Sequence, residues 1–300
     1  MKILLTGASG FIGRHLTAAL SRQRHEVLRL THGPVDAADP RLFSWDIAKG
    51  ALDERCLQGV DAVIHLAGES IAGARWSEAQ KQKIRDSRVL GTRLLLEKIA
   101  AQPTKPMAFL AASAIGFYGD RGAEELDESS SPGNDFLAGV VRDWEAETAK
   151  AAELGMRLVQ MRFGVVLGKE GGALGKMLLP FKLGLGGKVG SGEQFMSWIS
   201  VNDLVRAVLF LLEHQECHGV YNLTAPNPAT NAQFTQSLGR ALSRPTLFPM
   251  PAFAARLAFG EMADALLLGG QKVAPARLKA AGFQWEAPYL GEGLNKLLQP

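Results

Sequence analysis

Hydrophobic residues in the first half of the chain form short runs of buried-strand length, separated by longer stretches in which apolar residues recur with a helical period. Nearly continuous apolar runs are typical of strands that are covered on both faces. Strands alternating with helices predict a parallel sheet. We therefore predict an α/β fold with a doubly wound parallel sheet and a smaller, mainly helical C-terminal lobe.

The predicted elements follow this pattern along the chain. Strands are predicted at Lys2 to Thr6, Glu26 to Thr31, Ala62 to Leu66, Met107 to Ala112, Arg157 to Met161 and Val220 to Thr224. Helices are predicted at Phe11 to Arg22, Ser77 to Ala100, Phe136 to Leu154, Met177 to Leu185, Asn202 to His214, Asn231 to Leu242, Phe253 to Leu268 and Ala274 to Ala281. The predicted domains are residues 1–165, completed by about 200–224, and a smaller lobe from 166–199 and 225–300.

A glycine motif, Thr6-Gly7-Ala8-Ser9-Gly10-Phe11-Ile12-Gly13, joins the first strand directly to the first helix. In a dinucleotide-binding Rossmann turn, Gly7 permits the tight turn, Gly10 lets the backbone approach a pyrophosphate, and Gly13 allows close packing of helix on sheet. The free amides at the start of the helix, at Phe11 and Ile12, then face the phosphates. The alternative is that the glycines only satisfy turn geometry.

The end of the second strand bears on the choice of cofactor. An acid there would hold the ribose diol of NAD, but the strand ends Arg29-Leu30-Thr31-His32. NADP is therefore favoured, with NAD left open, and Arg14 either reaches the 2′-phosphate or is an ordinary exposed arginine. Asp46 either meets the adenine or caps a turn. The strand end Leu66-Ala67-Gly68 faces the cofactor, whereas His65 is predicted to pack within its strand.

The chain resembles extended short-chain dehydrogenases/reductases and sugar-nucleotide epimerases in the glycine motif, in His65-Leu66-Ala67-Gly68, and in Ser113 followed by Phe117-Tyr118-Gly119. Further stretches are similar to an atypical subgroup, the YfcH-type epimerase-family proteins. These stretches include Gly68-Glu69-Ser70-Ile71, Arg75-Trp76, Gly184-Leu185-Gly186-Gly187 and Gly269-Gly270-Gln271-Lys272-Val273. The resemblance implies cofactor contacts at Thr31, His32, Leu66, Ala67, Lys83, Arg88 and Val165. For Lys83 and Arg88 the alternative is a solvated helix face.

The proton-transfer pair of the extended family is missing. That pair is Tyr-x-x-x-Lys on one helix face, where the lysine lowers the tyrosine pKa. If Glu145 matches the family's acid on this helix, then Leu137 and Val141 replace the pair. Neither of these side chains transfers a proton.

Two hydroxyl groups remain as catalytic candidates near the expected site. Ser113, at the end of the fourth strand, is predicted to orient a substrate carbonyl. Tyr118 is a candidate acid if a cation such as Arg142 or Arg162 lowers its pKa. The alternative for Tyr118 is that it packs in the turn after the strand with its hydroxyl bonded to backbone.

The composition of the chain argues against two classes of binding partner. The formal net charge is +3 with lysines and arginines scattered among acids, and no segment approaches membrane-spanning length, so neither nucleic acid nor a membrane is an expected partner. Cys56 and Cys217 are far apart, which suggests no disulfide framework and no metal site, and suits a cytoplasmic protein.

Two functions follow, and the sequence leaves a homodimer possible for either. The first is an NADP-dependent oxidoreductase or epimerase acting on an unknown small polar carbonyl or sugar-like substrate. The second is a non-catalytic NADP-binding module with a regulatory or cell-division role, which the missing pair favours. Resemblance to a plastid-division protein makes this second role conceivable.

Overall fold

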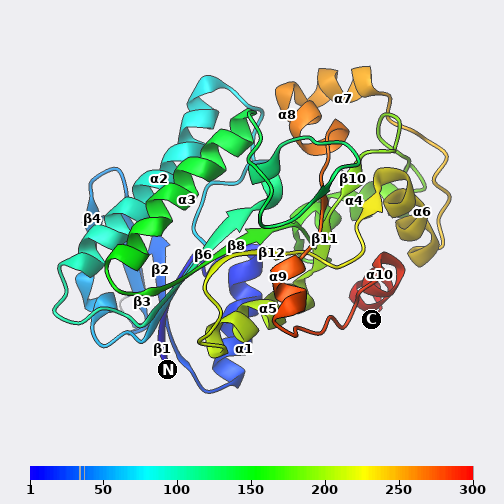
Figure 1. The fold of residues 1–300 in the computed structure, drawn as a ribbon. Coiled ribbons are helices and arrows are strands. Elements are labelled where there is room, and N and C mark those ends of the chain that lie inside the picture. Colours follow the sequence, from blue (N-terminus) through cyan, green and yellow to red (C-terminus); the bar gives the residue numbers. More distant parts are fainter. Residues whose placement is uncertain (34, 37, 300) are drawn as a thin grey trace. The chain divides into compact units, whose positions relative to one another are not determined.

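A large sheet organises the fold of the computed structural model, which describes residues 1–33, 35–36 and 38–299 (Figure 1). Its eight strands lie in the order β12 (Gly219–Leu223), β8 (Arg157–Phe163), β6 (Ala108–Ala114), β5 (Ala62–His65), β1 (Lys2–Thr6), β2 (Glu26–His32), β3 (Leu42–Asp46) and β4 (Ala51–Leu52). The neighbours from β6 to β3 pair in parallel, and β4 pairs antiparallel with β3. The strand order reverses at β1, which has β2 on one side and β5 on the other.

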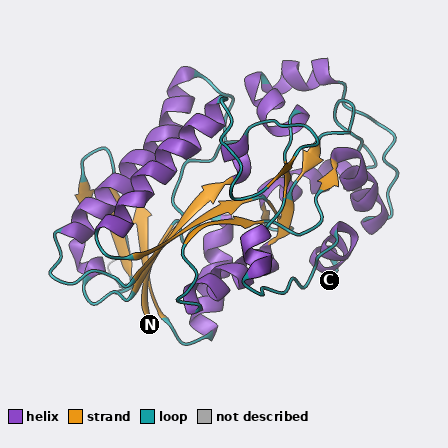
Figure 2. Cartoon of the chain, viewed as in Figure 1, coloured by secondary structure: helices purple, strands orange, loops and turns teal. Residues whose placement is uncertain are grey.

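Helices cover both faces of this sheet. The helix α1 (Phe11–Arg22) lies on one face, whereas α2 (Glu78–Ala100) and α3 (Phe136–Glu153) lie side by side on the other (Figure 2). The predicted start of α2 is confirmed, because Ser77 is its N-cap and accepts a hydrogen bond from the Gln80 amide. The predicted fold class, a doubly wound Rossmann sheet with a helical C-terminal part, is confirmed.

The chain divides into two compact units. Unit 1 consists of Met1–Ser113, Val140–Met161 and Val208–Val220, and unit 2 of Ala114–Gly139, Arg162–Ala207 and Tyr221–Pro300. The core of unit 1 is an apolar cluster between the sheet and its helices that includes Leu4, Val63, Leu95 and Phe109. The predicted domain limits, with a boundary at residue 165, stay a prediction.

Unit 2 contains short strands and helices. Its two-stranded sheets pair β10 (Phe195–Met196) with β13 (Ala229–Thr230), β11 (Trp198–Ser200) with β9 (Val165–Gly168), and β14 (Lys272–Val273) with β7 (Glu125–Leu126). The helices of this part are α4 (Gly172–Lys182), α5 (Val201–Glu213), which continues into unit 1, α6 (Asn231–Ala241), α7 (Ala252–Phe259), α8 (Glu261–Ala263), α9 (Ala276–Ala280) and α10 (Leu290–Leu298). No described helix combines the length and apolar character needed to cross a membrane.

Two predicted helices are wrong in extent. Met177 to Leu185 was predicted where the structure has α4, Gly172–Lys182. The segment Phe253 to Leu268 is not continuous, because α7 ends where Gly260 adopts a φ of 63°. That left-handed region suits glycine and interrupts a right-handed helix. The chain resumes as α8 and a π-helical turn, Asp264–Leu268.

Candidate functional site

The glycine turn lies at the carboxyl end of β1, where the strand order of the sheet reverses. Gly7 has a φ of 70°, and a Cβ atom there would lie 3.0 Å from the Ala67 amide nitrogen. A Cβ on Gly13 would lie 2.2 Å from the Gly7 carbonyl oxygen. Both positions therefore require glycine, one for the close approach of β5 and the other for the packing of α1 on the turn.

The N-terminus of α1 lacks a side-chain cap. Gly10 is its N-cap residue, with φ −69° and ψ 172°, and no side chain accepts a hydrogen bond from the first turn. The Gly10 amide donates to the Gly7 carbonyl at 3.0 Å, which closes the turn, and Phe11 and Ile12 begin the helix. Because the first amides and the helix dipole point out of this end, the turn suits an anionic group such as a phosphate.

At the end of β2, the Arg29 guanidinium pairs with Asp39, so its charge is already balanced. Thr31 is half-buried, and the exposed His32 ring stacks on Trp45 with 4.9 Å between centroids. The guanidinium of Arg14 donates to the Ser9 carbonyl at 2.8 Å, within the glycine turn. The Arg14 guanidinium of α1 thus lies at the glycine turn, and the end of β2, Thr31 and His32, carries no acidic side chain.

Asp46 ends β3 beside a pocket of about 540 Å³ that is lined by Gly33, Ser44, Trp45, Asp46, Lys49, Ala51, Leu52 and Asp53. Its carboxylate accepts from the Lys49 amide at 3.2 Å and pairs with the Lys49 side chain. These bonds lower the pKa of Asp46. The turn-capping alternative for Asp46 is therefore met in the structure, and its contact with adenine stays a prediction.

The end of β5 forms a second wall beside the turn. Leu66 and Ala67 lie against Gly7, and a Cβ on Gly68 would lie 3.1 Å from the Arg88 guanidinium carbon. That guanidinium donates to the Glu69 carbonyl at 3.0 Å, and its desolvation lowers the pKa of Arg88 to about 10. Arg88 is thus part of this wall rather than a solvated residue, whereas Lys83 is exposed on α2.

His65 is fully buried behind this wall. Its Nδ1 lies 2.8 Å from the Thr6 hydroxyl oxygen, and its Nε2 lies 3.0 Å from the Thr92 hydroxyl oxygen. Burial lowers the pKa of His65 to about 4. His65 is therefore a neutral, packed strand residue, as the sequence predicted.

This burial predicts a loss of stability in acid. The unfolded state takes up a proton near pH 6.5 and the folded state only near pH 4, so stability present above pH 6.5 is lost as the pH falls to 4. His65 should contribute about 3 kcal/mol to that loss. Urea unfolding at about pH 7 and about pH 4.5 measures the loss, which should be smaller in His65→Gln and unchanged in the control His218→Gln, an exposed histidine. An equal acid loss in His65→Gln would contradict this assignment.

Ser113, the first catalytic candidate, is only 3% exposed. Its hydroxyl donates to the Glu145 carboxylate at 2.6 Å. To donate to a substrate carbonyl, Ser113 would first have to break this charge-assisted bond. Its catalytic role stays a prediction.

Tyr118, the second candidate, is fully buried in unit 2. Its hydroxyl donates to the Asn222 side-chain oxygen at 2.8 Å and accepts from the Arg162 guanidinium at 3.0 Å. Burial raises the pKa of Tyr118, although the nearby Arg162 acts in the opposite direction. The predicted cation is present, but the phenol is a weaker acid than a free tyrosine. Its catalytic role also stays a prediction.

The remaining predicted positions are placed as follows. Leu137 and Val141 lie on α3, so the helix expected to carry Tyr-x-x-x-Lys has apolar side chains at these two positions. Val165 begins β9 of unit 2, and its amide donates to the Ser197 carbonyl at 2.8 Å. Its contact with a cofactor stays a prediction.

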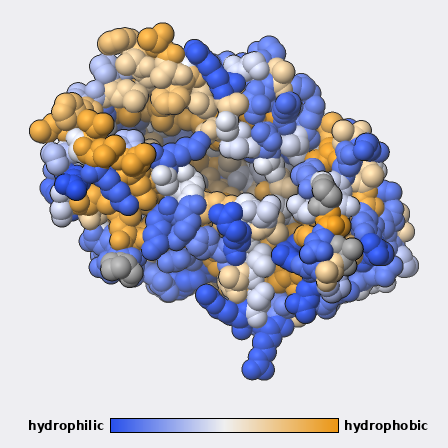
Figure 3. Space-filling view, turned by 180° about the vertical axis from the view of Figure 1, so that it is seen from behind, coloured by the Kyte–Doolittle hydropathy of each residue, from blue (hydrophilic) through white to orange (hydrophobic). Residues whose placement is uncertain are grey.

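Unit 2 also exposes apolar side chains on and near α4 and α7. Apolar residues gather at the upper left of Figure 3. The apolar side chains on and near these two helices that are more than half exposed are Leu179, Leu183, Leu185, Leu247, Phe248, Phe253 and Leu257. None of them belongs to the predicted site.

The contacts of Thr92 and Trp144 were not predicted. The Trp144 indole donates to the Thr92 hydroxyl at 3.1 Å, and that hydroxyl donates to the Arg88 carbonyl at 2.6 Å. The sequence holds one signal for this, since Arg88 and Thr92 are four residues apart and share a helix face.

Comparison with known proteins identifies the class. Residues 3–224 match the NAD dependent epimerase/dehydratase family, and residues 250–297 match a domain of unknown function, DUF1731. An epimerase family protein of Mycobacterium leprae is 42% identical, with 98% of this chain and 94% of the relative aligned. The human epimerase family protein SDR39U1 is 40% identical, with 99% and 100% aligned.

The chain therefore belongs to the NAD dependent epimerase/dehydratase family, as an atypical extended short-chain dehydrogenase/reductase. The predicted family resemblance is confirmed. Within that family, it is similar along its length to human SDR39U1, whose crystal structure with NADPH matches with a TM-score of 0.90 at 39% identity, covering 99% of both chains.

Proposed function

We propose that this protein binds NADP(H), with NAD as the weaker ligand, and acts on a small polar carbonyl or sugar-like compound. The observation that carries the proposal is the uncapped N-terminus of α1 behind a turn whose glycines admit no Cβ at Gly7 and Gly13. A pyrophosphate suits this cradle because it is anionic and needs close backbone approach. The NADPH in the crystal structure of human SDR39U1 supports the choice of nucleotide.

The contacts proposed for the cofactor come from several segments of the chain. The pyrophosphate would lie at Gly7, Gly10 and the α1 amides. The ribose phosphate would lie by Thr31, His32 and the Arg14 guanidinium, and the adenine by Asp46. The strand end Leu66-Ala67-Gly68, with Arg88 and Lys83 of α2 and Val165 of β9, completes the proposed set. When bound, such a cofactor supplies hydride chemistry, and the chain's residues hold and orient it.

NADPH should bind about tenfold more tightly than NADH, because one charge-assisted hydrogen bond to the 2′-phosphate is worth about 1.5 kcal/mol. Calorimetric titration with both nucleotides tests this. Arg14→Met should weaken NADPH binding and leave NADH binding unchanged, whereas Arg22→Met, at the other end of α1, should change neither. Equal or reversed affinities in the unmodified protein would refute the preference for NADP.

A second function, a non-catalytic NADP-binding module, is favoured by one observation. Both catalytic candidates are buried with their hydroxyl hydrogens donated to the protein, Ser113 to Glu145 and Tyr118 to Asn222. Incubation with NADPH and a panel of small aldehydes, ketones and nucleotide sugars separates the two functions. Oxidation of NADPH or conversion of a sugar supports catalysis, and binding without either supports the module.

A further inference from the structure

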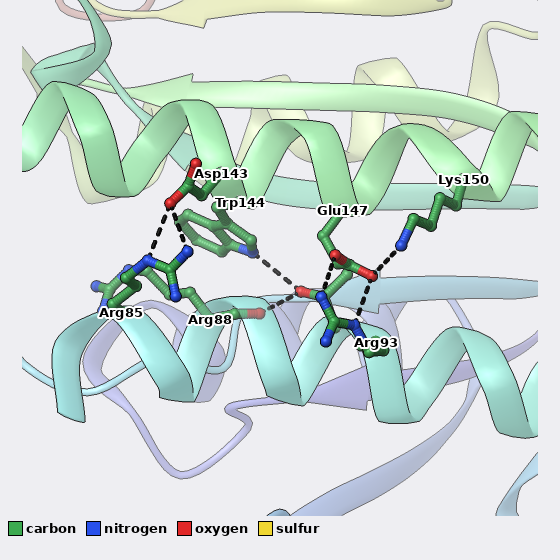
Figure 4. Close-up of polar contacts among 8 residues, drawn as sticks. Arg85, Arg88, Arg93, Asp143, Trp144, Glu147 and Lys150 are labelled. Atoms are coloured by element: carbon green, nitrogen blue, oxygen red, sulfur yellow. Dashed lines mark hydrogen bonds and ion pairs between the residues drawn. The ribbon is translucent and has the colours of Figure 1, made fainter. Parts of the chain in front are cut away.

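Only one assignment of donors and acceptors fits the hydrogen bonds around Thr92. The Thr92 hydroxyl donates its single hydrogen to the Arg88 carbonyl, at 2.6 Å, so its oxygen accepts from its other partners. One of these is the Trp144 indole, which only donates, and the other is His65 Nε2. His65 therefore carries its proton on Nε2. Figure 4 shows the part of this network between α2 and α3.

The same reasoning extends from His65 to Thr6 and to the Leu66–Ala67 backbone at the end of β5. Because Nδ1 of His65 has no proton, it accepts the Thr6 hydroxyl hydrogen. The Thr6 oxygen then has two lone pairs left, and it accepts the amides of Leu66 and Ala67, both at 3.1 Å. Every hydrogen and lone pair of the two hydroxyls is used. Those two amides belong to the backbone that lies against Gly7.

We infer that Thr92 is a positioning residue for the NADP site, because together with Thr6 it keeps the His65 proton on Nε2 and thereby holds the Leu66–Ala67 backbone beside the glycine turn. Without the Thr92 hydroxyl, a proton on His65 Nε2 has no acceptor, so the form with the proton on Nδ1 becomes more populated, although the Thr6 hydroxyl still opposes it. Thr6 would then face three donors with two lone pairs, and one of the amides would lose its partner. This inference rests on the proposed function, since it assigns the turn to NADP.

Aromatic side chains surround the His65 ring of this network, and the charged group beside the network is the Arg88 guanidinium, 5.2 Å from the centre of the Trp144 ring. Trp45 and Phe109 face the His65 ring at centroid distances of 6.3 Å and 6.0 Å, and only desolvation shifts its pKa. Trp144 and Thr92 are also buried. The tautomer is thus decided by hydrogen-bond partners rather than by a neighbouring carboxylate.

The test compares Thr92→Val, which keeps the shape and removes the hydroxyl, with Thr92→Ser, which keeps the hydroxyl. In Thr92→Val we expect ¹⁵N NMR to show the His65 proton partly on Nδ1, and calorimetry to show about tenfold weaker NADPH binding. Thr92→Ser should retain the Nε2 proton and the affinity of the unmodified protein. Trp144→Phe, which removes one donor but not the acceptor of His65, should retain the tautomer.

The control is Glu147→Gln. Glu147 lies on α3, as Trp144 does, but takes no part in the hydrogen bonds to Thr92 or His65. Glu147 pairs with Arg93 of α2 and with Lys150 of its own helix, α3 (Figure 4). Loss of the Glu147 charge should therefore lower the stability of the fold without changing the His65 tautomer or the NADPH affinity. A folded Thr92→Val protein with unchanged tautomer or affinity overturns the inference, as does equal weakening in Glu147→Gln. Failure of the unmodified protein to bind NADPH instead overturns the proposed function.

Discussion

Replacing Gly10 with Asp should abolish NADPH binding while leaving the protein folded. Gly10 is the N-cap of α1, with backbone angles that any residue adopts, and Asp is a favoured N-cap residue. Its Cβ would lie 3.2 Å from the Gly7 carbonyl, which needs a shift of only a few tenths of an ångström. The free energy of unfolding should therefore stay within about 1 kcal/mol of that of the unmodified protein.

The effect on binding should be much larger. A carboxylate at the N-cap would occupy the place proposed for the pyrophosphate and repel it, so we expect at least about a hundredfold loss of affinity for NADPH. Calorimetry measures the affinity, and urea unfolding checks the fold.

Gly10→Asn is the matched control for charge, because Asn has nearly the size of Asp and is an equally favoured cap. Asn should weaken binding less than Asp does, and the difference measures repulsion. Retained affinity in a folded Gly10→Asp protein would remove the glycine turn from the proposed site.

The turn could be predicted because its evidence is local. The strand, the three glycines and the helix are contiguous, and each glycine has one steric reason that holds wherever the motif occurs. The predicted limits of α1, Phe11 to Arg22, match the structure at both ends. The predicted strand cores are also present, since apolar runs between helices have few other interpretations.

Elements that depend on distant contacts were missed. The helix α10 contains Gly291 and Gly293, which lower helix propensity and disguise it in the sequence. In the fold, a Cβ on Gly293 would lie 2.8 Å from the Trp198 ring, so tertiary packing requires the glycine that propensity disfavours. The strand β3 was missed because it is short and mostly half-buried, with only Trp45 fully buried.

In the candidate site, too, local features could be predicted from the sequence and features that depend on distant contacts could not. Sequence reasoning placed His65 inside its strand and named Arg88 from the family resemblance. It did not name Thr92, because the bonds that make Thr92 important come from separate elements of the chain. Sequence also raised Arg162 as a cation for Tyr118, and the two side chains are in contact. The alternative of a packed Tyr118 agrees with its burial, but the hydroxyl bonds to the side chains of Asn222 and Arg162 and not to backbone.

The geometry favours a structural outcome for Tyr118→Phe. The substitution keeps the ring, which packs among Ile115, Leu126 and Val273, and removes a hydroxyl that bonds to two buried groups. Asn222 would lose its donor and Arg162 one acceptor, which should lower the free energy of unfolding by about 2 kcal/mol. Urea unfolding measures this, and Tyr289→Phe, at a tyrosine that is 58% exposed, should change stability by less than about 0.5 kcal/mol.

The kinetic outcome decides whether Tyr118 also acts as an acid. Its hydroxyl hydrogen is held by Asn222 and burial raises its pKa, so proton donation to a substrate would require both opening of the packing and loss of that bond. We therefore expect the folded Tyr118→Phe protein to bind NADPH as the unmodified protein does and to keep any turnover found with the substrate panel. A catalytic acid would instead cost about a hundredfold or more in turnover at unchanged NADPH affinity. That result, in a variant shown to be folded, would establish that the buried phenol reaches the substrate.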